Sequence, residues 1–476
     1  LQNLFIRHLS TNLIDLVKKD ISLGEIKGIE MVGTDTLSNN TKKIKFWTQD
    51  NHVLLQQMVS SKEDVASADA NAFFNQTKTT GKPLLFDLKA SKAKLIVDDL
   101  KSIDTTTHKY AKGAFQFYSF EKDELPALYS AFKHPYTDDT SSTGTKRLII
   151  DKIESIKDKD AVPVIKSFYQ DNSLSVDNRA RLLKSLTVID STTYDWYFDE
   201  LLKSDFKLSD DVSLFEPLQD SVSYVASRMP QFLTLIDKPN YRYDVLNVVD
   251  IMLDADSVST YKELISKHAK TITKHAINDL DEELKAIGND SFPMKTYQYL
   301  GILPKIDQKL LDEFTSKLLN IDSADYLKSY AVRLRVENRL PVSQSIIIAQ
   351  LDSLSSRYDI MKAYHKIGEL HKLPKKYLEP SEFCKALVYD YVSDDYELSE
   401  ISLVGSIEYK GKISYVYSFK IKGEEDPLNY IAIAGEFEKG KQKIDFENNF
   451  AYSNFVEIES DWKTQALAMI KEGEEK

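Results

Sequence analysis

The eight histidines and the single cysteine are the residues whose chemistry most often marks a catalytic or metal site. No histidine forms the HExxH pair of a zinc hydrolase or lies beside a second cysteine. His268 and His275 are seven residues apart and could share a helix face, but two imidazoles without a third ligand do not make a zinc site. Cys384 lies beside Phe383, and we interpret it as a small core residue. We therefore expect no bound transition metal and no thiol chemistry.

The sequence also shows no calcium loop, nucleotide-binding loop or serine-hydrolase motif. The segment Asp279–Glu283 (DLDEE) places four carboxylates in five residues, but it lacks the glycine and the alternating spacing of a calcium loop. We interpret it as a solvated helix face. The sequence also lacks a GxSxG elbow, a Walker A loop and a GxGxxG loop. These patterns predict a protein that is not an enzyme and that carries no cofactor.

Two aromatic clusters are the best candidates for binding. The rings of Tyr194–Phe198 cannot all point inward from one helix, and Tyr241–Tyr243 combines two rings with a guanidinium. Large rings and arginine dominate the energies of protein interfaces, and rings also stack on sugars. The alternative is that these rings pack between helical hairpins. Our candidate partner-binding residues are Trp196, Tyr197, Tyr241 and Arg242.

Composition excludes several classes of protein. Of the 476 residues, 42% are hydrophobic and 29% are charged, which is typical of a globular chain of two to four domains. The net charge is −12 and no basic run offsets it, so nucleic acid is not an expected partner. The longest apolar stretches are far too short to span a bilayer, and we predict no transmembrane segment.

The first part of the chain predicts mixed structure. Apolar spacing favours a helix over residues 1–20, and alternation favours a strand at Lys42–Thr48. A second strand is predicted at the aromatic-rich segment Ala114–Phe120, and a short helix follows from Asp123 to Phe132. The polar segment Thr137–Thr145 (TDDTSSTGT) is predicted to be a domain linker.

From about residue 146 to 370 the strand signal vanishes. Apolar residues recur at spacings of three and four, and polar breaks come every 12 to 20 residues, as at Lys157–Asp160 and Asp190–Thr193. Each unit is a helical hairpin that cannot bury its own apolar face. Stacking against neighbouring hairpins completes the core, and this arrangement is an α-solenoid.

Two hairpins of this segment resemble the HEAT-type helical repeat family. The resemblance lies in the turn Asp160-Ala161-Val162-Pro163 and in the next hairpin, which opens at Ser175-Val176-Asp177-Asn178-Arg179 and continues into Leu182-Leu183-Lys184-Ser185-Leu186. It implies that the aspartate and arginine tie neighbouring repeats together while the apolar positions pack. The fold alone implies no particular function.

The end of the chain predicts an antiparallel meander with a covering helix. Alternation favours strands at Ile401–Tyr409, Ile413–Ile421 and Tyr430–Phe437, with a fourth strand starting at Ile444–Phe446. A helix is predicted at Asp461–Ile470.

The predicted fold is therefore mainly α with flanking α+β structure. We predict an N-terminal α+β domain over residues 1–140 and a HEAT-like helical-repeat domain over residues 141–382. A C-terminal β-meander plus helix occupies residues 383–476.

A recurrent triplet of Asp, Ser or Thr, and a small aliphatic residue or Thr points to an extracytoplasmic location. It resembles the O-glycosylation motif of exported Bacteroidota proteins, and the alternative is that the aspartates cap helices. The layout also resembles the C-terminal part of large exported Bacteroidota proteins with an upstream TraB/GumN-like domain. Because the sequence starts at Leu1 and not at Met, we expect that a segment precedes it. The proposed acceptors are Thr36, Thr105, Ser191, Ser221, Ser257, Ser323 and Ser353.

Three functions are consistent with these patterns. The first is a non-enzymatic scaffold or accessory subunit that binds protein partners in a periplasmic or outer-membrane-associated assembly, since solenoids offer extended surfaces. The second is the non-catalytic C-terminal part of an exported hydrolase whose active domain lies before residue 1. The third is a glycan-binding module that uses Trp196 and its neighbours.

Overall fold

The computed structural model describes most of the chain as two compact units. The first is Leu1–Tyr197 with Leu208–Val212, and the second is Phe198–Lys207 with Ser213–Lys476. The described residues are 13–23, 26–36, 38–49, 52–76, 91–139, 144–209, 212–255, 260–287, 292–321, 325–393, 395–423, 427–441 and 443–474.

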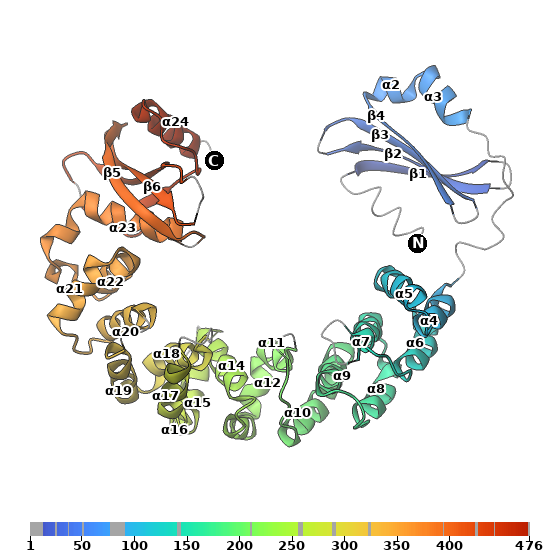
Figure 1. Ribbon diagram of the computed structural model, residues 1–476, viewed down its shortest axis with the longest axis horizontal. Coiled ribbons are helices and arrows are strands. Elements are labelled where there is room, and N and C mark those ends of the chain that lie inside the picture. The colour runs from blue at the N-terminus through green and yellow to red at the C-terminus, as the bar shows by residue number, and fades with distance from the viewer. Residues whose placement is uncertain are drawn as a thin grey trace. The chain divides into compact units, whose positions relative to one another are not determined.

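The first unit begins with an antiparallel sheet of four strands in the order β1-β2-β3-β4 (Figure 1). The predicted strand is confirmed as β3, but the predicted helix over residues 1–20 is wrong from Leu13 onward, where β1 pairs with β2. Residues 1–12 lie outside the described part. The strands are β1 (Leu13–Leu23), β2 (Ile26–Asp35), β3 (Thr41–Gln49) and β4 (His52–Ser60).

Two short helices, α2 (Lys62–Ala66) and α3 (Ala68–Asn75), follow this sheet. The ammonium groups of Lys43 and Lys45 donate to the side chains of Asn71 and Asn75 on α3, and both lie over the buried ring of Phe74. The α2–α3 segment therefore packs on the lysine-bearing face of β3.

Helices begin earlier than the sequence predicts. The segment α4 (Ala93–Leu100) precedes α5 (Thr105–Phe117), so the predicted strand at Ala114–Phe120 is wrong. Phe115 is fully buried while Phe117 is exposed, and such two-residue alternation also occurs at the edge of a helix face. The predicted short helix is confirmed as η1 (Lys122–Glu124) followed by α6 (Leu125–Phe132).

The predicted linker is tied to both of its flanks where the structure describes it. The Asp138 carboxylate lies 2.7 Å from Lys112 on α5 and accepts a 3.0 Å hydrogen bond from Thr145 at the start of α7. Helix α6 also packs on α7 (Thr145–Ile156), and Phe132 of α6 stacks on Phe168 of α8 (Val162–Tyr169). The domain boundary near residue 140 stays a prediction.

The prediction that residues 146–370 are almost wholly helical is confirmed for the described residues, among which this segment contains no strand. Within each unit, helices that are close in the chain pack on one another. The first helices of this segment are α7 (Thr145–Ile156), α8 (Val162–Tyr169), α9 (Val176–Ile189) and α10 (Tyr194–Lys203), with η2 (Lys159–Ala161) and η3 (Ser191–Thr193) before α8 and α10. Those that follow are α11 (Glu216–Asp220), α12 (Val222–Ser227), α13 (Met229–Phe232), η4 (Leu233–Asp237), α14 (Arg242–Ala255), α15 (Thr260–Lys267), α16 (Ala269–Ile272), α17 (Ala276–Ala286), α18 (Met294–Ile306), α19 (Gln308–Leu319), α20 (Asp325–Glu337), α21 (Gln344–Asp352), α22 (Leu354–Lys366), η5 (Leu370–Lys372), η6 (Lys375–Leu378) and α23 (Pro380–Ser393).

Polar ties recur between successive hairpins. Five of them join a lysine to a carboxylate that lies 29 to 38 residues away in the chain. Exposed pairs of this kind contribute less than about 1 kcal/mol each, so they fix the register of neighbouring hairpins more than they stabilise the stack. The five pairs are Lys122–Asp160, Lys159–Asp190, Lys274–Asp237, Lys317–Asp281 and Lys366–Glu337.

The residues that carry the HEAT resemblance make such ties. Asp177 accepts hydrogen bonds from the backbone N–H and the hydroxyl of Ser209, at 3.1 and 2.7 Å. Arg179 donates to the carbonyl of Tyr169 on the preceding helix. Arg179 therefore ties α9 to the helix before it, and Asp177 ties α9 to the segment that follows α10.

The chain ends in a second four-stranded antiparallel sheet, in the order β5-β6-β7-β8, which confirms the predicted meander (Figure 1). Helix α23 covers one face through Phe383 and Cys384, and α24 covers the other through Ala466 and Met469. The fourth strand begins later than predicted, because Asp445 forms a turn. The elements are β5 (Leu398–Tyr409), β6 (Lys412–Ile421), β7 (Tyr430–Glu438), β8 (Phe450–Tyr452) and α24 (Trp462–Glu474).

Within the described ranges, no helix has both the length and the apolar character that a bilayer-spanning segment requires.

Candidate functional site

Three of the four predicted binding residues lie in the interior. Tyr197 and Tyr241 are 0% exposed and Arg242 is 9% exposed, so the prediction that they offer a contact surface is wrong. The Tyr241 hydroxyl accepts a 2.8 Å hydrogen bond from the backbone N–H of Phe206 and lies 2.8 Å from the Ser204 hydroxyl. These rings fill space between hairpins, which is the alternative that the sequence left open.

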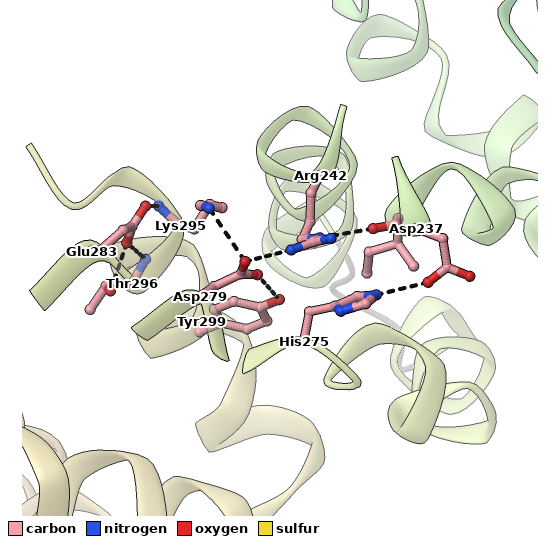
Figure 2. Close-up of polar contacts among 9 residues, drawn as sticks. Asp237, Arg242, His275, Asp279, Glu283, Lys295, Thr296 and Tyr299 are labelled. Atoms are coloured by element: carbon pink, nitrogen blue, oxygen red, sulfur yellow. Dashed lines mark hydrogen bonds and ion pairs between the residues drawn. The ribbon is translucent and has the colours of Figure 1, made fainter. Parts of the chain in front are cut away.

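Arg242 is part of a buried ionic network in the second unit (Figure 2). Its guanidinium donates to the carbonyl of Ile236 at 2.9 Å and forms a 2.5 Å ion pair with Asp279, whose side chain is 1% exposed. Tyr299 donates a 3.0 Å hydrogen bond to Oδ2 of Asp279, and the Lys295 ammonium lies 3.3 Å from Oδ1 of the same carboxylate. The interpretation of residues 279–283 as a solvated helix face is therefore wrong for Asp279.

Neighbouring polar groups extend this network to two helix starts (Figure 2). The Glu283 carboxylate accepts hydrogen bonds from the backbone N–H groups of Lys295 and Thr296 and so caps the first turn of α18. His275 lies 2.7 Å from Asp237 at the start of α17. Burial, and next the charge of Asp279, raise the pKa of Tyr299, which keeps that hydroxyl protonated as a donor. The network joins η4, α14, α17 and α18.

Trp196 is the one predicted residue that remains partly accessible. Its indole is half-buried, lies edge-on to Tyr169 at 5.4 Å, and has the Lys166 ammonium 4.6 Å from its ring centroid. These contacts hold it in place on α10. Partner binding at Trp196 stays a prediction.

The structure reveals an exposed aromatic strip that sequence reasoning missed. Phe292 and Tyr297 are stacked with centroids 5.0 Å apart, and Tyr297 and Tyr326 are parallel at 6.5 Å. Phe292 is 62% exposed and Tyr326 is 48% exposed. The strip joins the start of α18 to the start of α20, so no local sequence pattern could have assembled it.

A pocket of about 490 Å³ lies beside this strip, between α20, α21 and α22. Tyr326 belongs to both the strip and the pocket wall. Five serines line it together with one aspartate, one lysine and one glutamine, beside the apolar side chains of Ile346 and Ala349. The polar lining residues are Asp325, Lys328, Ser329, Ser345, Gln350, Ser353, Ser355 and Ser356.

A separate apolar stripe lies on the first hairpin of the helical segment. Ile103, Tyr110 and Phe117 are spaced seven residues apart and are 101%, 75% and 70% exposed. The opposite side of α5 buries Ala111 and Phe115. Helix α5 therefore has two apolar faces, and only one of them is buried in the hairpin stack.

The residues first tested for chemistry have structural environments. Cys384 is fully buried, as predicted, and burial raises the pKa of its thiol. His268 and His275 do not share a helix, because they precede α16 and α17 respectively. Among the described residues, no group of three or more His, Cys, Asp or Glu side chains could hold a metal ion.

The aspartates of two glycosylation-like triplets cap helices. Asp104 accepts a 2.7 Å hydrogen bond from the Thr107 N–H at the start of α5, and Asp190 accepts one of 3.0 Å from Thr192. The alternative explanation for the triplets is therefore correct at these two positions. Of the proposed acceptors, Thr36, Thr105, Ser191 and Ser353 are exposed, Ser221 is half-buried, and Ser257 and Ser323 lie outside the described residues.

Comparisons with known proteins place the chain in no family. No family model matches it, and a search of curated proteins finds no match. Among solved structures, a chain from the complex of CpcE and CpcF of phycocyanin lyase from Nostoc sp. PCC7120 is 14% identical, covering 61% of this chain and 99% of that chain, with a TM-score of 0.23. The resemblance to HEAT repeats therefore stays a prediction.

Proposed function

We propose that the protein is a non-enzymatic scaffold or accessory subunit of an extracytoplasmic assembly, and that a protein partner docks on its helical segment. Hairpins that are tied to one another offer a stiff and extended surface, as solenoids do. The exposed hydroxyls of Thr36, Thr105 and Ser191 are compatible with glycosylation of an exported protein.

The observation that carries this proposal is the apolar stripe of Ile103, Tyr110 and Phe117. Tyr110 and Phe117 are seven residues apart and line one side of α5, and Ile103 lies just before the N-cap residue of this helix. A heptad spacing is how a helix presents itself to a partner helix. Three large apolar groups that are at least 70% exposed are unusual on a surface with no binding role. The stripe fits an amphipathic helix of a partner protein.

Photo-cross-linking in cells tests this function. A photoreactive amino acid is placed at Tyr110 or Phe117, and at Lys109 as a matched control on the same helix. We expect a cross-link to one other protein from the stripe positions and not from the control. Equal cross-linking at Lys109 would argue against a docking stripe, and so would the absence of any product.

One double variant separates docking from folding. The double variant Tyr110→Ala/Phe117→Ala removes exposed groups only, so the free energy of unfolding should change by less than about 0.5 kcal/mol. Loss of the cross-linked partner at unchanged stability supports the scaffold function. A cross-link to a second copy of the chain would assign the stripe to self-association instead.

A further inference from the structure

We propose that the pocket between α20, α21 and α22 binds a neutral carbohydrate, with Tyr326 as the stacking ring at its rim. This site lies in the second unit and does not rest on the scaffold function, whose docking stripe lies in the first. The inference places glycan binding at a different surface from Trp196, where the sequence suggested it.

The size and the polarity of the pocket fit a small polar ligand. Its volume of about 490 Å³ lies within the range of known ligand sites. Serine hydroxyls both donate and accept hydrogen bonds, which matches the hydroxyls of a sugar. Ser329 projects from α20, Ser345 from α21, and Ser353 and Ser355 from the start of α22, so three helices contribute to the lining.

One buried group of the lining lacks a partner. Gln350 is 9% exposed, and its Oε1 receives no hydrogen bond from the described part of the chain. A buried carboxamide oxygen is normally satisfied, and because the last torsion of a glutamine side chain is soft, this lining residue can turn its oxygen toward a donor in the pocket. A sugar hydroxyl can supply it.

The start of α22 adds further donors. Ser353 is the N-cap residue, but its hydroxyl does not cap the helix and lies 2.8 Å from the hydroxyl of Ser355 instead. The first N–H groups of a helix have no partner within the helix. Two rotatable hydroxyls beside these N–H groups can bind adjacent hydroxyls of a ligand.

Charge selects a neutral ligand over an anion. A phosphate would favour the helix start and Lys328, but Asp325 lies in the same wall and would repel it. One carboxylate and one ammonium together can accept from and donate to a polyhydroxylated molecule without a net charge in the site.

The aromatic strip provides the apolar part of the recognition. A pyranose ring has a face of C–H bonds that packs on an aromatic ring, and the exposed half of Tyr326 borders the pocket. Tyr297 and then Phe292 continue the strip away from the pocket. An oligosaccharide that places one unit in the pocket has further rings to contact along this strip.

Binding of defined sugars to the full chain tests the proposal. The probes are a panel of neutral tetrasaccharides built from glucose, N-acetylglucosamine, xylose or mannose, with inorganic phosphate as the anionic comparison. Saturation-transfer NMR identifies the sugars that bind, and calorimetry measures their affinity. We expect saturable binding of at least one tetrasaccharide and none of phosphate.

Variants assign that binding to the pocket. Tyr326→Ala and Gln350→Met should each weaken it at least tenfold, while Tyr391→Ala, at a tyrosine of α23 that is 40% exposed, should leave it unchanged. Gln350→Met removes an unpartnered buried oxygen, so its melting temperature should not fall, which separates lost binding from lost folding. Absence of binding across the panel would overturn the proposal, and so would binding of phosphate alone or full affinity in both pocket variants.

Discussion

Replacing Asp279 by asparagine removes the central charge of the buried network and keeps the shape of the side chain. The carboxylate pairs with Arg242, accepts from Tyr299 and lies 3.3 Å from Lys295, and its side chain is 1% exposed. In the variant, the single amide oxygen cannot accept from both Arg242 and Tyr299, which donate to different oxygens of the carboxylate. The guanidinium of Arg242, whose side chain is 11% exposed, then stays buried without a counter-charge. Breaking one side of a buried ion pair costs about 3–5 kcal/mol.

The variant Asp281→Asn is a matched control on the same helix. Asp281 forms an ion pair with Lys317 in which the two side chains are 43% and 40% exposed. Exposed pairs of this kind contribute about 0–1 kcal/mol, so the control should hardly change stability. The two substitutions have identical chemistry and differ only in burial.

Amide hydrogen exchange is the suitable assay, because it reports the opening free energy of each helix. A loss of about 3 kcal/mol corresponds to exchange that is roughly 150-fold faster in α14, α17 and α18, since 1.36 kcal/mol is tenfold. The apolar double variant Arg242→Met/Asp279→Leu should recover part of the loss. Equal acceleration by Asp279→Asn and Asp281→Asn would refute the reasoning, as would acceleration confined to α17.

Three further predictions concern other buried groups. Burial raises the pKa of Asp244 from 3.8 to about 6, so the contribution of this group to stability is largest below pH 4 and is lost as the pH rises through 6. In urea unfolding, Asp244→Asn should therefore be more stable than the parent at pH 7, by at most about 3 kcal/mol, and equally stable at pH 3.5. Burial raises the pKa of Cys384, so a thiol reagent should react only as fast as the protein unfolds, and rapid labelling in native buffer would contradict its placement. A Cβ at Gly405 would lie 2.7 Å from the Trp462 ring, so Gly405→Ala should cost about 1–3 kcal/mol by thermal unfolding, whereas Gly473→Ala, which meets nothing within 4 Å, should not destabilise.

The periodicity of the sequence was sufficient to predict the helical segment and the C-terminal meander. In β6, for example, Tyr417 and Phe419 face α23 while Val416 faces α24, so the alternation read from the sequence is the alternation of two covered faces. Local patterns succeed here because each element buries one regular set of side chains.

The failure at β1 has a specific physical cause. Leu13 and Leu16 are spaced as in a helix, yet both pack on the same core cluster of the sheet. The pairing with β2 shifts register between Ile14 and Val17, and Asp15 has a φ of 52°. A β-bulge inserts one residue, so side chains three apart can share a strand face. A helical spacing of apolar residues therefore does not exclude a strand with a bulge.

The candidate sites could not be predicted because their partners are distant in the chain. Asp279 belongs to a run of carboxylates that favours solvent, and its burial depends on Arg242, 37 residues earlier, and on Tyr299, 20 residues later. Tyr326 is the opposite case, because an aromatic residue is expected in a core and this one is 48% exposed. Tyr326 borders a pocket whose lining comes from α20, α21 and α22, so its place beside that pocket depends on the packing of all three helices. Binding residues of a helical repeat are those whose exposure departs from their local pattern, and such departures are visible only after the helices are placed.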